Sequence, residues 1–166
     1  MKYYAGIGSR QTPKHLIPII DKIVLKLNEL GYTLRSGAAD GADTFFENKS
    51  VLNEIFLPWE GYNGHTSQLF NDTKEGWELA KLYHPNWEAL SYGAKKMMVR
   101  NCYQVLGFDL KTPVEFIVCW TKDGKASGGT GFAIRLAKAY NIPIFNLYYE
   151  NAYKELIKHI QPFSLF

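Results

Sequence analysis

The chain has 166 residues, of which 46% are hydrophobic and 21% charged, as is typical of one soluble globular domain with a substantial core. The formal net charge of +3 is too small to indicate nucleic-acid binding, and no apolar run is long enough to span a bilayer. Residues 1–4 lead directly into a strand-like run and lack the layout of a signal peptide. We therefore expect a single domain over residues 1–166, a cytoplasmic location and no membrane association.

Strand-like and helix-like segments alternate along the chain. We expect the first helix to start at Thr12 and Pro13, with the threonine as N-cap, and to end at Gly31. Residues 59–86 are the least regular stretch and are predicted to form a lid-like insertion or side wall with a short helix at 74–83. Strands are predicted over residues 2–7, 32–35, 53–57, 114–120 and 142–147, and helices over residues 12–30, 40–49, 87–106, 132–140 and 150–160.

This alternation predicts a Rossmann-like α/β fold, an open parallel sheet with helices on both faces. Right-handed crossovers then place the turns that follow the strands along the carboxyl edge of the sheet. Three of these turns, at residues 6–10, 36–43 and 127–131, are rich in glycine. Glycine lets backbone N–H groups approach a ligand closely, and a following helix adds positive potential. The sequence therefore predicts one pocket for a phosphate-bearing, nucleotide-like molecule.

The first and third turns carry the candidate phosphate-binding groups. Gly8 allows the first turn to lie against a ligand, and Ser9 and Arg10 can hydrogen-bond a phosphate. The third turn combines consecutive N–H donors with two hydroxyls and is the candidate pyrophosphate cradle. Its members are Ser127, Gly128, Gly129 and Thr130.

The second turn contributes Gly37, Asp40 and Asp43 to the candidate site. We expect one aspartate to cap the following helix and the other to accept a ribose hydroxyl. A helix N-terminus stabilises a carboxylate, so we expect neither a raised pKa nor proton transfer here. On the long helix, Arg100 and Asn101 are expected to point into the pocket.

Aromatic residues follow the third strand at the expected ligand edge. Trp59 and Tyr62 are the candidates for stacking on a base, with His65 and Trp120 as further possibilities. The two cysteines, Cys102 and Cys119, fall in a helical and a strand-like pattern and are expected to be small core residues. No histidine has metal-ligand spacing, so we predict no metal site and no cofactor.

The three turns together resemble the motifs of the SLOG superfamily, which unites the DNA-processing protein A (SMF) group with the Lonely Guy cytokinin-activating enzymes. Residues 8–10 resemble its opening motif, and residues 36–43 resemble the S-G-G-A-x-G-x-D motif of the DNA-processing group. Residues 126–130, with the strand at 142–145 behind them, resemble its third motif. The opening over residues 4–13 resembles that of small single-domain proteins encoded by bacteriophages.

The chain departs from the Lonely Guy motif P-G-G-x-G-T-x-x-E. Ser127 stands in place of the proline, and Arg135 falls where that motif has its catalytic glutamate. Arg100 matches the family's upstream arginine, but its acidic partner is missing, and nothing in the sequence assigns that role to Glu115 or Asp43. The resemblance therefore implies a nucleotide pocket but not hydrolysis by this route.

A third branch of the superfamily senses NAD-derived signals in bacterial antiviral defence. By this resemblance we expect a phage anti-defence protein that binds an ADP-ribose or cyclic ADP-ribose derivative and sequesters it without cleavage in the host cytoplasm. One alternative is a nucleotide phosphoribohydrolase of the Lonely Guy type. The other is a single-stranded DNA-binding protein like the DNA-processing group, although the dispersed Lys and Arg residues make nucleic acid a poor partner.

The resemblance also implies a homo-oligomer. Four aromatic residues near the C-terminus, Tyr148, Tyr149, Phe163 and Phe166, are candidates for its interface.

Overall fold

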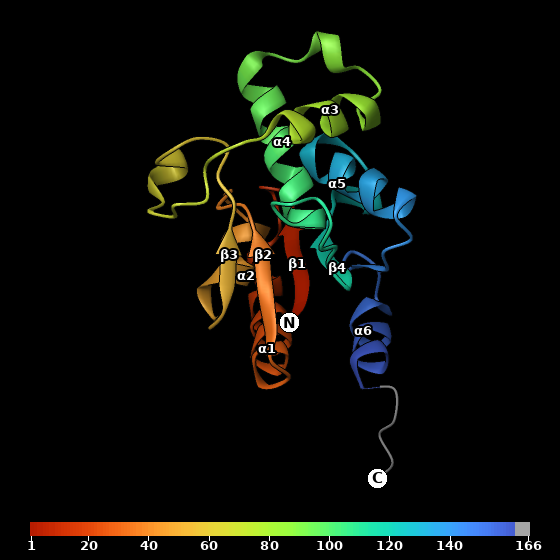
Figure 1. Cartoon of the computed structure of the whole chain (residues 1–166). Coiled ribbons are helices and arrows are strands. Elements are labelled where there is room, and N and C mark those ends of the chain that lie inside the picture. Colours follow the sequence, from red (N-terminus) through yellow and green to blue (C-terminus); the bar gives the residue numbers. More distant parts are fainter. Residues whose placement is uncertain (162–166) are drawn as a thin grey trace.

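The computed structural model describes residues 1–161, in which five parallel strands form one sheet with helices on both faces (Figure 1). The strand order is β3-β2-β1-β4-β5. The first three strands therefore run from the centre of the sheet to one edge, and β4 and β5 form the half on the other side of β1. The strands are β1 (Lys2–Gly8), β2 (Tyr32–Ser36), β3 (Asn53–Ile55), β4 (Phe116–Trp120) and β5 (Ile144–Asn146). The predicted Rossmann-like α/β fold is confirmed, and its switch of direction lies between β1 and β4.

Two helical layers cover the sheet. One apolar core joins it to α1, α2 and α6, and the other joins it to α3, α4 and α5. The helices are α1 (Ile17–Glu29), α2 (Ala42–Asn48), α3 (Lys74–Tyr83), α4 (Tyr92–Leu106), α5 (Gly128–Ala139) and α6 (Ala152–Ile160).

Side chains of the central strands alternate between the two cores, as the pleat of a strand requires. Tyr4 of β1 and Phe116 of β4 stack at 5.9 Å on the side of α1, α2 and α6. Ala5 and Cys119 are fully buried on the other side, and so is Cys102 of α4. Both cysteines are therefore core residues, as predicted, and burial raises the pKa of each thiol to about 12.

The first helix begins later than predicted. A single 3-10 turn, Lys14–Leu16, precedes α1, which starts at Ile17 with Pro18 in its first turn. Thr12 is not an N-cap; its buried hydroxyl donates to the Ser9 carbonyl at 2.6 Å and stabilises the turn after β1. Proline suits the first turn of a helix, and Pro18 occupies that place.

Two other helices also begin at residues other than those predicted. A 3-10 turn, Trp87–Ala89, stands before α4, and the Ser91 hydroxyl accepts from the Ala94 N–H at 3.1 Å as the N-cap of that helix. In contrast, α5 begins at Gly128, four residues before the predicted start. The third glycine-rich turn is therefore itself the first turn of a helix.

The second part of the predicted insertion at 59–86 packs firmly on the rest of the domain. Ala80 of α3 is fully buried, and Trp77 meets Trp87 edge to face at 5.9 Å. The Tyr103 hydroxyl of α4 accepts from the backbone N–H of Thr73 at 2.7 Å. Helix α3 is thus part of the layer formed by α4 and α5, and a lid role remains a prediction for the residues that precede it.

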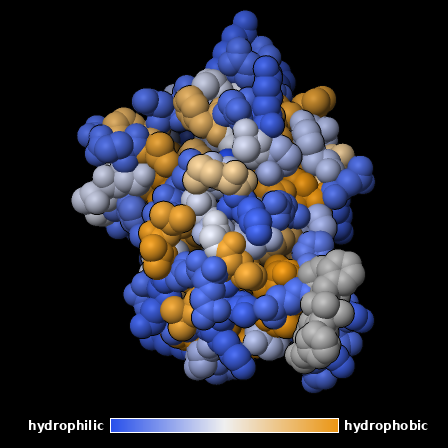
Figure 2. All heavy atoms as spheres, turned by 60° about the horizontal axis from the view of Figure 1, so that its bottom comes forward, coloured by the Kyte–Doolittle hydropathy of each residue, from blue (hydrophilic) through white to orange (hydrophobic). Residues whose placement is uncertain are grey.

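Among residues 1–161, no helix has both the length and the apolar character that a membrane crossing requires. Apolar side chains on the face shown in Figure 2 form small groups among hydrophilic ones. Tyr148 and Tyr149 are 44% and 56% exposed, whereas Phe163 and Phe166 lie outside the described residues. The homo-oligomer remains a prediction.

Candidate functional site

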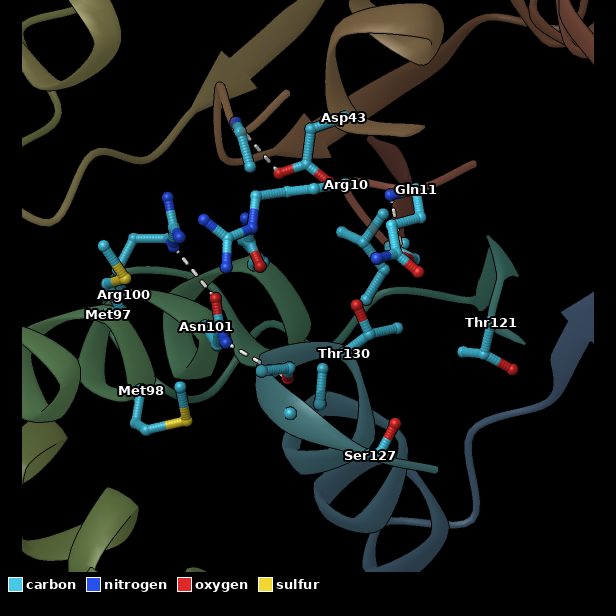
Figure 3. Close-up of a pocket in the computed structure, with 18 of the residues that line it drawn as sticks. Arg10, Gln11, Asp43, Met97, Met98, Arg100, Asn101, Thr121, Ser127 and Thr130 are labelled. Carbon is cyan, nitrogen blue, oxygen red and sulfur yellow. Dashed lines mark hydrogen bonds between the residues drawn. The ribbon is translucent and has the colours of Figure 1, made fainter. Parts of the chain in front are cut away.

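A cavity of about 340 Å³ opens at the carboxyl edge of the sheet, where the turns after β1 and β4 meet α4 and the start of α5 (Figure 3). This is the place where open parallel sheets bind ligands, because the chain leaves β1 and β4 in opposite directions there. Most of the predicted site residues line this cavity. They are Gly8, Ser9, Arg10, Asp43, Tyr62, Arg100, Asn101, Ser127, Gly128, Gly129 and Thr130.

The first turn of α5 presents hydrogen-bond donors to the cavity. The N–H of Gly131 bonds to the Ser127 carbonyl at 2.9 Å and is the first to find an acceptor inside the helix. The N–H groups of Gly128, Gly129 and Thr130 come before it and, as at any helix start, have no acceptor within the helix. Because these residues line the cavity and the helix dipole is positive here, this end of the cavity favours an anion.

Unpaired cations add to this positive potential. Arg10 and Lys122 line the cavity, and neither forms an ion pair within residues 1–161. In Figure 3 the Arg10 side chain extends from the turn after β1 toward the part of α4 that carries Arg100 and Asn101. Asp43 is the one acidic side chain lining the cavity in the described part of the chain. The lining therefore has an excess of positive charge.

Arg100 also lines the cavity, but the protein itself uses much of its guanidinium. Its Nη1 donates to the carbonyls of Gly37 and Phe56, and its Nε donates to Asn101 Oδ1 at 2.9 Å. The Tyr62 ring lies 5.4 Å from the guanidinium. These bonds tie α4 to the segments that leave β2 and β3, so Arg100 shapes the pocket in addition to facing it.

Asp43 differs from the expectation for a carboxylate beside a helix start. Burial raises its pKa from 3.8 to about 6, although the Arg100 charge and backbone N–H groups, including that of Ala39, lower it. The Ala39 N–H donates to Asp43 Oδ2 at 3.4 Å, and the residue is only 4% exposed. The prediction of an unraised pKa was wrong because loss of solvent outweighs the favourable charges and dipoles.

Gly37 does not line the cavity, contrary to its prediction as a binding residue. A Cβ at this position would overlap the side-chain nitrogen of Gln104 and come within 2.6 Å of Arg100 Nη1. Glycine is thus needed here for close packing against α4.

Asp40 and Trp59 also lie outside this cavity. Asp40 Oδ1 accepts from Asn63 Nδ2 at 3.1 Å, and neither aspartate caps α2, whose N-cap is Gly41 without a side-chain hydrogen bond. Trp59 stands edge-on to Tyr62 at 5.4 Å. Of the two predicted stacking residues, only Tyr62 reaches the cavity.

Several lining residues were not predicted. Helix α4 presents Met97, Arg100, Asn101 and Gln104 to the cavity, a spacing of three, four and seven residues that lies on one helix face. Extending the predicted pair by one turn in each direction would have found the other two. Lys122, in the irregular turn after β4, had no such signal.

Arg135 and Glu115, the two residues considered in the comparison with the Lonely Guy motif, both lie outside the cavity lining. Arg135 is not among the lining residues; burial lowers the pKa of His84, and the nearby Arg135 charge lowers it further. The carboxylate of Glu115 accepts from the Tyr32 hydroxyl at 2.9 Å and does not line the cavity either.

No protein-family model matches this sequence, and no curated protein matches it. Among solved structures, the chain is similar to DNA processing protein A from Helicobacter pylori, a protein described for its unique single-stranded DNA binding mode. The TM-score is 0.57 at 16% sequence identity, over 87% of this chain and 64% of that one. The chain thus spans less than two thirds of that protein, and the likeness shows a shared α/β fold.

Proposed function

We propose that this protein binds a phosphate-bearing nucleotide of the ADP-ribose or cyclic ADP-ribose type in the cavity at the carboxyl edge. The strongest support is that backbone N–H donors without an acceptor in the helix and cationic side chains line the same cavity. Gly128, Gly129 and Thr130, whose N–H groups come before the first hydrogen bond within α5, line the same cavity as Arg10 and Lys122. Such a lining favours a ligand with more than one negative charge.

In this proposal the two phosphates occupy the turn after β1 and the first turn of α5. Ser9 and Arg10 bind one phosphate, and residues 127–130 bind the other. Tyr62 packs against the base, together with the thioethers of Met97 and Met98, which line the same cavity.

We also propose that the protein binds the ligand without cleaving it. Cleavage of an N-glycosidic bond needs acid or base groups at the reacting atoms. Arg135, which the resemblance places at the glutamate of the Lonely Guy motif, does not line the cavity, and backbone N–H groups stabilise the Asp43 carboxylate. We therefore infer sequestration: a phage protein of this kind would keep an NAD-derived immune signal from its receptor.

A titration of ADP-ribose into three proteins tests the binding mode. Arg10→Ala removes a cavity cation, and Lys14→Ala removes one from the exposed 3-10 turn four residues further on. Because hydrogen bonds to charged groups contribute about 1.5–3 kcal/mol, Arg10→Ala should weaken binding by roughly 10-fold or more. Lys14→Ala should bind like the wild type. Equal affinity of all three proteins would refute the phosphate assignment.

Single-stranded DNA is a second candidate ligand, because the similar protein from Helicobacter pylori is described as binding it. Binding to an oligodeoxynucleotide that weakens steeply with salt would favour this candidate. If the nucleotide proposal is right, ADP-ribose binds with an ordinary oligodeoxynucleotide present and is not displaced by it.

A further inference from the structure

Two buried polar side chains that line the cavity can form hydrogen bonds to a ligand that the proposed phosphate contacts do not involve. Gln104 is 2% exposed and lines the cavity, and within residues 1–161 its side-chain amide makes no hydrogen bond to another protein group. Asp43 is 4% exposed and also lines the cavity. The amide is not among the fully buried polar groups that lack a partner within residues 1–161, so it has access to the cavity, where it can hydrogen-bond a ligand.

These two side chains meet at Gly37. The Gly37 N–H is among the backbone groups that stabilise the Asp43 carboxylate. The Gln104 side-chain nitrogen packs against the α-carbon of the same glycine, in the space that a Cβ would fill. The carboxylate and the amide therefore both lie next to Gly37, and both residues line the cavity although Gly37 itself does not.

The chemistry of this pair suits hydroxyl groups. An ionised carboxylate only accepts hydrogen bonds, whereas an amide both donates and accepts. A hydroxyl can donate to the carboxylate and accept from the amide at once. A phosphate at this spot would be repelled by Asp43, and an apolar base face would leave both groups unpaired.

The distance to the anion end of the cavity is also suitable. Asn101 Nδ2 donates to the Gly129 carbonyl at 3.2 Å and so marks where α4 meets the first turn of α5. Gln104 lies one helical turn further along α4, about 4.5 Å at 1.5 Å per residue. A sugar attached directly to a phosphate spans a distance of this order.

We propose that Asp43 and Gln104 form a subsite for the vicinal hydroxyls of the ribose next to the phosphate, which selects ribonucleotides over deoxyribonucleotides. This inference rests on the proposed function and deepens it. It also separates the ligand from single-stranded DNA, whose sugars lack the 2′-hydroxyl.

The test compares ADP with 2′,3′-dideoxy-ADP by calorimetry, because the two differ only in the sugar hydroxyls. Sites that hydrogen-bond a substrate hydroxyl reject analogues that lack it, so the wild type should bind the dideoxy compound at least ~10-fold more weakly. Gln104→Met keeps the volume and removes the amide, and should reduce this gap to less than about threefold. Gln68→Met makes the same change at an exposed position and should leave the gap unchanged.

Other outcomes separate the subsite from the proposed function. Equal binding of ADP and dideoxy-ADP overturns the subsite and leaves nucleotide binding standing. A gap that survives in Gln104→Met overturns the role of Gln104. Absence of ADP binding overturns the subsite, and absence of both ADP and ADP-ribose binding overturns the proposed function as well. Should Gln104→Met not fold, Gln104→Asn withdraws the amide by one carbon and is expected to shrink the gap in the same way.

Discussion

Mild acidification should stabilise this fold through Asp43. Its carboxyl has a pKa of about 6 in the folded protein, against 3.8 as the ordinary value. The folded state therefore binds this proton more tightly than the unfolded state does. The free energy of unfolding contributed by this group is lowest above a pH of about 6, rises as the pH falls toward 4, and stays level below that.

The size of the effect follows from the two pKa values. A shift of about two units at about 1.4 kcal/mol each corresponds to about 3 kcal/mol between the two ends of this pH range. Asp43→Asn carries a neutral side chain of the same shape and should lack this pH dependence. Asp40→Asn, at an exposed neighbouring position, is the matched control and should keep it.

Urea unfolding at several pH values between about 4 and about 7 measures the effect. Other groups titrate equally in the wild type and the variant, so the difference between their free energies of unfolding isolates Asp43. That difference should change by about 3 kcal/mol across the range. A constant difference would show that the carboxyl is as well solvated in the folded protein as in the unfolded one, and the reasoning about its burial would be refuted.

Three further predictions concern the site and the core. Gly128 has a φ of +62° and open space where a Cβ would lie, so Gly128→Asp and Gly128→Asn should carry equal backbone strain. Only the charged Asp variant should lose ADP-ribose binding, by roughly 10-fold or more relative to the Asn variant in calorimetry. Leu27→Ala should lower the free energy of unfolding by about 2–5 kcal/mol because Leu27 is fully buried, whereas Leu25→Ala, at a 51% exposed position on the same helix, should change it by less than about 0.5 kcal/mol in urea unfolding. The thiols of Cys102 and Cys119, with pKa values raised to about 12, should resist a thiol reagent at neutral pH until urea unfolds the chain, and rapid labelling of the native protein would contradict their burial.

Elements with strong local patterns could be predicted from the sequence. The alternation of strands with amphipathic helices was enough for the parallel sheet, because each crossover leaves few alternatives for the next strand. The helix starts were less certain, since Pro13 and Pro18 both satisfy the rule for a first turn and only packing distinguishes them. The start of α5 was predicted too late for a different reason. A run of glycines is typical of a loop, and the sequence alone does not show that this run is the first turn of a helix.

The site could be predicted where glycine-rich turns follow strands, since chain direction alone brings those turns to one edge. It could not be predicted where three-dimensional burial decides. The raised pKa of Asp43 depends on loss of solvent, which no local sequence signal carries. Gly37 packs against the side chain of Gln104, a residue 67 positions away, and no local signal in the sequence indicates this contact.

The most direct test of the central claim is a calorimetric titration of the wild-type protein with ADP-ribose and the cyclic ADP-ribose isomers. It is followed by chromatography of the ligand released on denaturation. We predict saturable binding of at least one of these compounds and its recovery unchanged. Recovery of a free base or a ribose phosphate would show that the protein is an enzyme, and no binding of any of them would contradict the nucleotide site itself.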